Sequence, residues 1–342
     1  LEGREFLVIP LTMTLFSFFG AAFGMCEEAM PFALIFVPMA LALGYDSIVG
    51  VSLTLLAAGV GFAGAFFNPF TLQIAQGLAG VEPLSGMGYR VLVWVLVTVV
   101  TIAWVMVYGA RVKRNPELSP MFDLDEARRE AIAAEHAEVA PTLSWRHIAV
   151  LLILAAGIAG MIIGVLRWKW YIKELAGLFL AMGLTAAFAA GQSVDAMAKS
   201  FVAGCKDIAS AALVVGFAGG IIVVLEDGRI MDTLLHGMAG ATSAMPAFLA
   251  AGTQFLLQMA LNFFIPSGST KAALTMPLMG PLADLSGITR QTAVLAYQLG
   301  DGFTNMIFPT SGVTIGTLGL AKIPYERWFR WNLPMQVFFV LL

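Results

Sequence analysis

Two halves of this sequence carry polar and proline interruptions in the same order. In the first half, Gly24–Pro31 interrupts an apolar run and Asn68-Pro69 interrupts the next one. In the second half, Asn262–Lys271 and then Phe308–Gly312 do the same. Matching interruptions of this kind are typical of the binding sites of secondary transporters. They constrain the fold strongly, because irregular backbone at membrane depth is tolerated only where protein or a water-filled cavity surrounds it.

The composition requires a membrane environment. Of the 342 residues, 59% are hydrophobic and only 12% are charged, whereas soluble domains carry about 25% charged residues. A chain this apolar cannot cover its surface in water, so we expect an all-α polytopic membrane protein. The two cysteines imply no disulfide framework, and the three histidines show no ligand spacing. We therefore expect no cofactor and no metal other than Na+.

Apolar runs of about 20 residues, the length that spans a bilayer as a helix, divide the chain into two repeats. We expect the first repeat over residues 1–112. It contains a re-entrant helical hairpin at about 6–45, which enters the membrane, turns and returns, and a broken transmembrane helix at about 48–79. A cytoplasmic linker follows over 113–145, where Asp123–Glu138 has the charge spacing of a solvated helix.

The second repeat is expected over 146–342, with its re-entrant hairpin at about 245–285 and its broken helix at about 289–321. The basic segment Arg111–Arg114 places the end of the preceding span in the cytoplasm. Counting spans from there opens the first hairpin to the cytoplasm and the second to the outside, so the repeats have inverted topology. We expect a multi-pass protein of the bacterial inner membrane that contacts lipid and no nucleic acid.

Two adjacent glutamates, Glu27 and Glu28, lie within the first hairpin. Ionisable groups at membrane depth are costly and usually functional, and the apolar arm before them is long enough to reach the middle of a bilayer. We expect them to hold a cation. This cation is either the positive group of a solute, or Na+, or a proton. The alternative is that both lie in a turn at the membrane surface.

The tip of the second hairpin carries Ser267, Gly268, Ser269 and Thr270, ahead of a returning helix. Hydroxyl and backbone N–H groups at a helix N-terminus bind carboxylates or coordinate ions. We expect these residues to bind a solute, with Ser267 and Ser269 also binding a coupling ion. Lys271, directly after them, either meets a carboxylate of the solute or extends its ammonium group towards water.

Proline in the middle of a broken helix frees backbone carbonyl groups, and such hard oxygen ligands suit Na+. The ion-coupling candidates at the two breaks are Asn68, Pro69, Asp301, Thr310 and Ser311. The solute-binding candidates there are Asn68, Asn305 and Thr310. The sequence leaves open whether Tyr297 and Gln298 are packing groups or solute contacts.

The ordered set of motifs resembles the YfcC-like proteins, which belong to the C4-dicarboxylate anaerobic carrier group of the ion transporter superfamily. The matching segments are Gly24–Glu28, Asn68-Pro69, Asn262–Ser269, Ala273–Pro277, Pro281–Asp284, Thr289–Gln291, Gly300–Asn305 and Pro309–Gly312. The resemblance implies a secondary carrier with two inverted repeats that often works as a homodimer. It also implies opening helices ahead of Leu1, so we expect the first repeat to be incomplete at its N-terminus.

These observations predict a secondary active transporter, a symporter or an antiporter, that is coupled to Na+ or H+. Its solute is expected to be small and amino-acid-like, with basic amino acid antiport as one form. Glu27 and Glu28 would face the cation of the solute, and the second hairpin tip would face its carboxylate. The alternative is a carrier of C4-dicarboxylates or short-chain carboxylates, in which Lys271 and the two tips form the anion site.

Two other classes fit the sequence less well. An enzyme is not expected, because the sequence shows no Ser–His pair, no paired metal-ligand motif and no nucleotide-binding loop. A channel would conduct ions without saturation by a solute.

Overall fold

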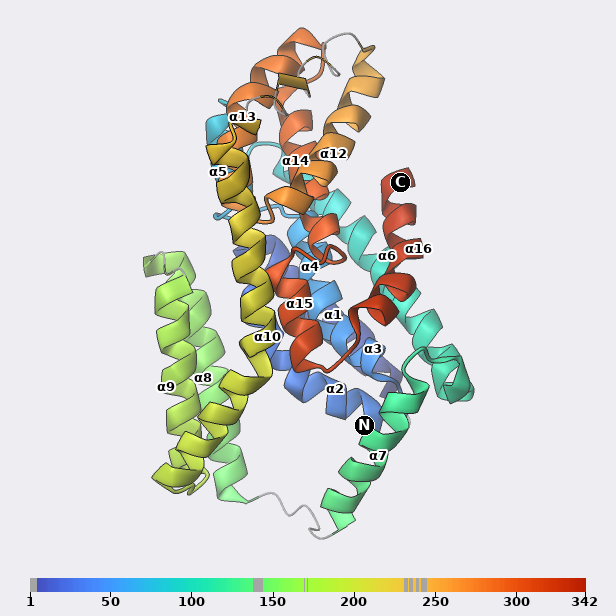
Figure 1. Cartoon of the computed structure of the whole chain (residues 1–342), viewed down its shortest axis with the longest axis vertical. Coiled ribbons are helices and arrows are strands. Elements are labelled where there is room, and N and C mark those ends of the chain that lie inside the picture. Colours follow the sequence, from blue (N-terminus) through green and yellow to red (C-terminus); the bar gives the residue numbers. More distant parts are fainter. Residues whose placement is uncertain are drawn as a thin grey trace. The chain divides into compact units, whose positions relative to one another are not determined.

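The structure is a computed structural model that describes residues 5–137, 144–168, 170, 172–230, 233, 236–237, 240 and 245–342. Within these residues the regular secondary structure is all helical (Figure 1). Residues 1–4 of the predicted first repeat and 138–143 of the predicted linker lie outside this set. The chain divides into two compact units, the first formed by residues 1–129 and 210–342 and the second by residues 130–209. Every predicted binding residue belongs to the first unit.

Short breaks separate the helices in the first part of the first unit. The helices are η1 Glu5–Leu7, α1 Val8–Phe23, η2 Glu27–Phe32, α2 Ala33–Ala42, α3 Ser47–Val51, the π-helical turn η3 Ser52–Leu56, α4 Ala57–Ala63, α5 Leu72–Leu78, α6 Met87–Arg114, η4 Pro116–Leu118 and α7 Phe122–Ala137. The chain is not helical between α4 and α5, where Pro69 cannot donate the N–H that a helix needs. The first apolar run is likewise interrupted between α1 and η2.

The second part of the first unit repeats this pattern of breaks. Its helices are the end of α10 Val194–Asp227, α12 Ala247–Phe264, α13 Gly268–Leu285, α14 Arg290–Asn305, α15 Gly312–Leu320 and α16 Tyr325–Leu341. Pro266 lies in the break between α12 and α13, and Pro309 lies in the break between α14 and α15. Ser311 then begins α15, because its side chain caps the N–H of Thr314.

The second unit contains α8 Trp145–Trp168, α9 Ile172–Ala189 and the start of α10. α8 and α9 pack against each other along their lengths. The helices α7 and α10 each cross the division between the units.

The two interrupted helices form the centre of the first unit. α4 packs against α14, and the amide of Gln298 donates to the carbonyl of Phe62 at 2.7 Å between them. α1 packs on α4, and α12 packs on α14 in the same way. The short helix after each break packs on the other half of the chain, so α5 contacts α13 and α15 contacts η2. This arrangement brings both breaks to the same region.

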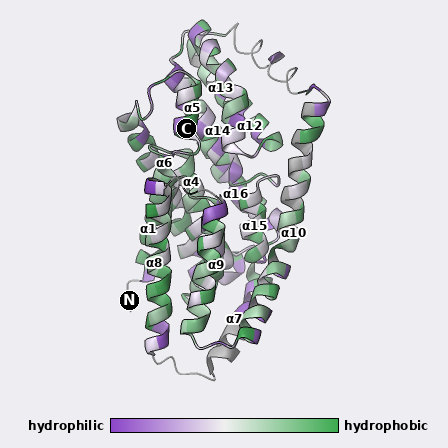
Figure 2. Cartoon of the chain, turned by 90° about the vertical axis from the view of Figure 1, so that its left-hand side faces the viewer, coloured by the Kyte–Doolittle hydropathy of each residue, from purple (hydrophilic) through white to green (hydrophobic). Residues whose placement is uncertain are grey.

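The outward side chains of α6 are apolar. Leu92, Val99 and Val107 are 64%, 58% and 52% exposed, and Figure 2 shows hydrophobic residues along most of the helices. Among the described residues, two segments are long and apolar enough to cross a membrane, Glu5–Phe23 and Met87–Arg114. This pattern of apolar exposure suits contact with lipid.

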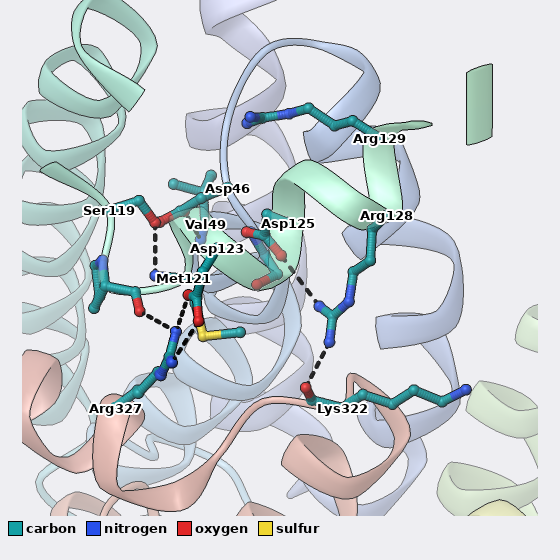
Figure 3. Close-up of polar contacts among 12 residues, drawn as sticks. Asp46, Val49, Ser119, Met121, Asp123, Asp125, Arg128, Arg129, Lys322 and Arg327 are labelled. Atoms are coloured by element: carbon teal, nitrogen blue, oxygen red, sulfur yellow. Dashed lines mark hydrogen bonds and ion pairs between the residues drawn. The ribbon is translucent and has the colours of Figure 1, made fainter. Parts of the chain in front are cut away.

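The polar segment 115–129, which belongs to the first unit, packs onto other helices of that unit (Figure 3). Asp46 caps α3 by accepting a hydrogen bond from the N–H of Val49 at 2.9 Å. The same carboxylate accepts hydrogen bonds from Ser119 Oγ, at 2.6 Å, and from the hydroxyl of Tyr108. The segment is therefore attached to the turn that precedes α3.

One carboxylate in the first turn of α7 is buried, which differs from the solvated helix that the charges predict. Asp125 is fully buried and accepts a hydrogen bond from the N–H of Ser47 at 2.7 Å. Arg128 donates to Asp125 at 3.2 Å and also to the carbonyl of Lys322. The charge spacing was misleading here because a buried carboxylate with several donors and a solvated carboxylate look alike in sequence.

Segment 115–129 also contacts the start of α16. Arg327 forms a two-pronged ion pair with Asp123 and donates to the carbonyl of Pro120 at 2.6 Å. The hydrogen bond from Arg327 lowers the pKa of Asp123 to about 2, so the pair stays charged at neutral pH. The segment thus joins α3, from the first half of the chain, to α16, from the second.

Asp125→Ala is expected to destabilise the protein by about 1–3 kcal/mol, because the buried N–H of Ser47 loses its acceptor. The measurement is the melting temperature of the purified protein in detergent. The matched control is Glu126→Ala, which removes an exposed carboxylate from the next position. Equal melting temperatures for the two variants would contradict the buried role of Asp125.

Candidate functional site

A lysine and an aspartate form an ion pair in the interior of the first unit. Lys271 Nζ, from the first turn of α13, lies 2.7 Å from Asp301 Oδ1 of α14, and both side chains are 0% exposed. The break between α12 and α13 makes this contact, because it turns the chain and sets the start of α13 beside α14. The ammonium group also lies over the ring of Tyr297, 5.3 Å from the ring centre.

Asn262 connects the ion pair to the surrounding helices. Its Oδ1 accepts a hydrogen bond from Lys271 Nζ at 2.9 Å, and its Nδ2 donates to Thr304 Oγ1 at 2.8 Å and to Asn305 Oδ1 at 2.9 Å. Asn305 Nδ2 lies 3.4 Å from Asp301 Oδ2 and donates to it. Lys271 and Asp301 therefore each have a polar partner in addition to the ion pair. A buried ion pair needs such partners to offset its lost hydration.

The tip of the second hairpin lies against the first break. A Cβ atom on Gly268 would lie 2.6 Å from Thr71 Cγ2 and 3.0 Å from Asp301 Oδ2, so only glycine fits without displacing a neighbour. The carbonyl of Gly268 accepts a hydrogen bond from Tyr297 at 2.6 Å. The second tip, the first break and the ion pair are therefore in contact.

The end of α1 reaches the same break. Gly24 has a φ of 71°, and a Cβ atom there would lie 2.6 Å from Asn68 Oδ1. That oxygen accepts hydrogen bonds from the N–H groups of Phe70, at 2.9 Å, and Thr71, at 3.3 Å. In the turn from Asn68 to Thr71, Asn68 thus contacts Gly24 and Thr71 contacts Gly268. The turn therefore touches both predicted hairpins.

The two glutamates differ in their surroundings. Glu27 is exposed, whereas Glu28 is half-buried and accepts a hydrogen bond from the N–H of Cys26 at 3.2 Å. The helix η2 that carries them packs against α15, and Glu27 lies close enough to Asp301 for the two carboxylates to interact electrostatically. Within the described part of the chain, neither glutamate has a cationic partner.

The hydroxyl residues of the second tip lie at the start of α13. Ser267 precedes the first residue of the helix, and its hydroxyl donates to that of Thr270 at 3.0 Å. Ser267 and Thr270 are exposed and Ser269 is half-buried. These side chains are therefore accessible from outside the protein.

The carbonyl groups near the two breaks already accept hydrogen bonds from the protein. The carbonyl of Asn68 accepts from the N–H of Gln73 at 3.2 Å, and that of Phe308 accepts from the N–H of Ser311 at 3.1 Å. Side chains of α15 and α16 donate to the carbonyl groups of Asn305–Ile307. Asn68 and Phe308, whose carbonyl oxygens the sequence suggested for Na+, therefore already have protein donors.

Two threonine hydroxyl groups at the breaks have no protein partner among the described residues. They belong to Thr71, at the first break, and Thr310, at the second, and both side chains are buried. Pro69 is half-buried in the first break, and Ser311 is used as a helix cap. No three His, Cys, Asp or Glu side chains in the described ranges converge as a metal site would require.

Several residues of this site differ from their expected roles. Lys271 does not extend towards water, because Asp301 holds its ammonium group in the interior. Asn262 and Thr71 were not among the predicted site residues, although Asn262 opens the motif that carries the second tip. Of the two residues left open, Gln298 packs against α4, and Tyr297 bonds to the second tip.

Comparison with known proteins identifies related chains. The model of the C4-dicarboxylate anaerobic carrier family, DcuC, matches residues 1–342. The YfcC protein of Escherichia coli strain K12, whose name describes it provisionally as a basic amino acid antiporter, is 42% identical over 340 residues. That match covers 96% of this chain and 67% of YfcC.

A protein of Haemophilus influenzae is 34% identical over 335 residues, covering 98% of this chain and 66% of its own length. The chain thus spans about two thirds of the length of both relatives. Among solved structures, MtrF of Neisseria gonorrhoeae, described as illuminating a class of antimetabolite efflux pumps, is similar with a TM-score of 0.52 and 16% identity. That match covers 99% of this chain and 73% of MtrF, and it supports the fold alone.

Lys271→Met is expected to destabilise the protein by about 3–5 kcal/mol, because it leaves the buried carboxylate of Asp301 without its cation. The double variant Lys271→Met/Asp301→Leu is expected to recover most of this loss. Unfolding in detergent measures both changes. Lys199→Met, which breaks an ion pair whose side chains are 77% and 75% exposed, is the control and should change little. Additive losses in the double variant would show that the two charges do not act as a pair.

Proposed function

The chain belongs to the DcuC family of C4-dicarboxylate anaerobic carriers, and from this premise we propose that it is an ion-coupled secondary transporter of a small, cationic, amino-acid-like solute. As a member of this family it is a membrane transporter and not an enzyme. The solute, the coupling and the binding residues are our proposals. The name of the E. coli relative supports a basic amino acid and an exchange mechanism.

The observation that carries the choice of solute is the charge at the two tips. Asp301 neutralises Lys271, so the second tip brings no net positive charge to a solute. Glu27 and Glu28 have no cationic partner in the described part of the chain. The remaining net charge is therefore negative, which attracts an amine or a guanidinium and repels a dicarboxylate.

The remaining groups suit the other end of such a solute. The α-carboxylate would bind the hydroxyl groups of Ser267, Ser269 and Thr270 and the N–H groups at the start of α13. The free hydroxyl of Thr310 and the side chains of Asn68 and Asn305 would bind the rest of the solute. Gly268 lets the tip approach, and Lys271 acts here as the partner of Asp301.

For the coupling ion we propose a proton. The hydrogen bonds already made by several carbonyl groups at the breaks support this choice over Na+, because they occupy oxygens that would otherwise be available to the ion. The titratable groups near the tips are Glu27, Glu28 and Asp301. Any of these carboxylates can carry a proton through the transport cycle.

We further propose a multi-pass protein of the bacterial inner membrane, built from two inverted repeats over 1–112 and 146–342 that the linker 113–145 joins. Each repeat would use one re-entrant hairpin and one broken helix. The short helix after each break packs on the predicted hairpin of the other half, α5 on α13 and α15 on η2. This exchange supports the arrangement, since a twofold relation between the halves would produce it. We expect the carrier to act as a homodimer.

In proteoliposomes that contain the full-length protein, labelled arginine or ornithine is expected to exchange for unlabelled solute, whereas succinate and short-chain carboxylates are not. Glu27→Gln and Glu28→Gln are expected to reduce arginine exchange by about tenfold or more, the effect of one lost charge-assisted hydrogen bond. Glu82→Gln, in the exposed loop after α5, is the control and should leave exchange unchanged. Exchange of succinate but not arginine would support a dicarboxylate carrier instead.

Replacing sodium by choline is expected to leave arginine exchange and uptake unchanged, while a pH gradient is expected to drive net uptake. The measurement is initial uptake of labelled arginine with the two gradients varied separately. A requirement for sodium would overturn proton coupling. In that case Asn68→Ala and Thr310→Ala should each raise the sodium concentration for half-maximal uptake.

A further inference from the structure

Two buried glutamines lie on one face of α12. Gln254, Gln258 and Asn262 are spaced four residues apart, which places their side chains in a row along the helix. Gln254 and Gln258 are each 1% exposed. Asn262, at the end of the row, is hydrogen-bonded to the ammonium group of Lys271. The row therefore leads to the buried ion pair.

Both glutamine side chains lack protein partners. The Oε1 and Nε2 atoms of Gln254 and of Gln258 are buried and make no hydrogen bond with any described residue. Leaving such an atom dry costs about 1–3 kcal/mol, so four dry atoms on one helix face would be a large penalty. Buried polar groups of this kind are normally satisfied by ordered water, which makes about three hydrogen bonds.

The spacing of the row suits single waters between its members. Four residues of a helix rise about 6 Å, which is close to the length of two hydrogen bonds that share one water. The row faces α14. Gly300 of α14 packs closely on it, since a Cβ atom added at Gly300 would lie 3.0 Å from Cβ of Gln258. The apolar neighbours along α12 offer no competing donors or acceptors.

We propose that a file of ordered waters runs along this face of α12, past Gln254 and Gln258 to Asn262, and carries protons between the N-terminal end of α12 and the Lys271–Asp301 ion pair. This inference rests on the proton coupling proposed above and adds the route that the proton takes. In the predicted topology, the N-terminal end of α12 faces the outside of the membrane. The file would then open the ion pair to the external solution.

The proton transfer at the end of the file is simple. A water at Asn262 gives a proton to the carboxylate of Asp301 and receives one from the next water, so one proton enters the file for each that leaves. Neutral Asp301 no longer pairs with Lys271, which is free to move with the second tip. When the proton leaves, the carboxylate is charged again and the ion pair re-forms.

Few charged groups compete for this proton. The helices α4, α5 and α12, which pack against α14 or its neighbours, carry no titratable side chain. The groups that face Asp301 are Lys271 and Tyr297, and its carboxylate also interacts electrostatically with Cys26 and with Glu27 of η2. The charged residues of α16 lie near its N-terminal end, where Arg327 pairs with Asp123.

The test uses proteoliposomes of the full-length protein loaded with a pH-sensitive dye. Gln254→Leu and Gln258→Leu keep the volume of the side chain but remove its hydrogen bonds. Proton movement driven by an arginine gradient is expected to fall by about tenfold, the effect of losing one hydrogen-bonded step. Exchange of labelled for unlabelled arginine at equal pH transfers no net proton and is expected to stay unchanged. Gln336→Leu removes another buried amide, on α16, and should change neither rate.

The outcomes separate the two proposals. Wild-type protein that exchanges no arginine overturns the proposed solute and this inference with it. Variants that retain both arginine exchange and proton movement overturn the water file alone. Variants that lose both rates equally also overturn it, because they indicate damage to the carrier.

Radiolytic labelling with X-rays provides a second measurement that does not depend on transport. Bound water produces hydroxyl radicals that modify nearby side chains. Met259, the half-buried residue after Gln258, is therefore expected to be labelled more in the wild type than in the Gln258→Leu variant. Met276, which is fully buried on α13, serves as the internal reference. Equal labelling of Met259 in the wild type and in the Gln258→Leu variant, each measured relative to Met276, would overturn the water file.

Discussion

An ammonium group and a carboxylate that are both removed from water impose strict demands on the structure around them. Moving each charge out of water costs several kcal/mol, and the attraction between them offsets this only when other polar groups complete their hydrogen bonds. Asn262 and Asn305 supply those bonds from α12 and α14. The break before α13 brings Lys271 to Asp301, and the lack of a side chain at Gly268 lets the tip lie beside the first break. The hairpin, the glycine and the amides are thus parts of one arrangement.

In the proposed site, the same ion pair determines the charge that a solute would meet. Counted by sequence alone, the two tips carry two negative residues and one positive residue. Pairing in the interior removes the positive charge from this count and leaves Glu27 and Glu28. A lysine next to a serine-rich tip therefore has the opposite meaning in the fold from the one it suggests in sequence, where it looks like a site for an anion.

The sequence predicted the parts of the site better than their contacts. Pro69, Pro266 and Pro309 cannot continue a helix, so the interruptions were visible from local chemistry. The ion pair was not, because Lys271 and Asp301 are separated by the remainder of α13, a turn and most of α14. Asn262 and Thr71 were missed for the same reason, since Asn262 bonds to residues of α13 and α14 and Thr71 lies against Gly268 of the second tip. Asp125 was misjudged because its burial depends on Ser47, which lies far away in the sequence.

The buried ion pair also restricts how sequences of this family can change. Replacing either charge alone leaves the other buried without a partner, which destabilises the protein. Single substitutions at these two positions are therefore selected against. Positions 271 and 301 should therefore change together, both charged or both uncharged, when related chains are compared. Under the proton coupling proposed above, a relative that has lost both charges would need another carrier for its proton, and this pair of positions would mark the branch of the family where that change arose.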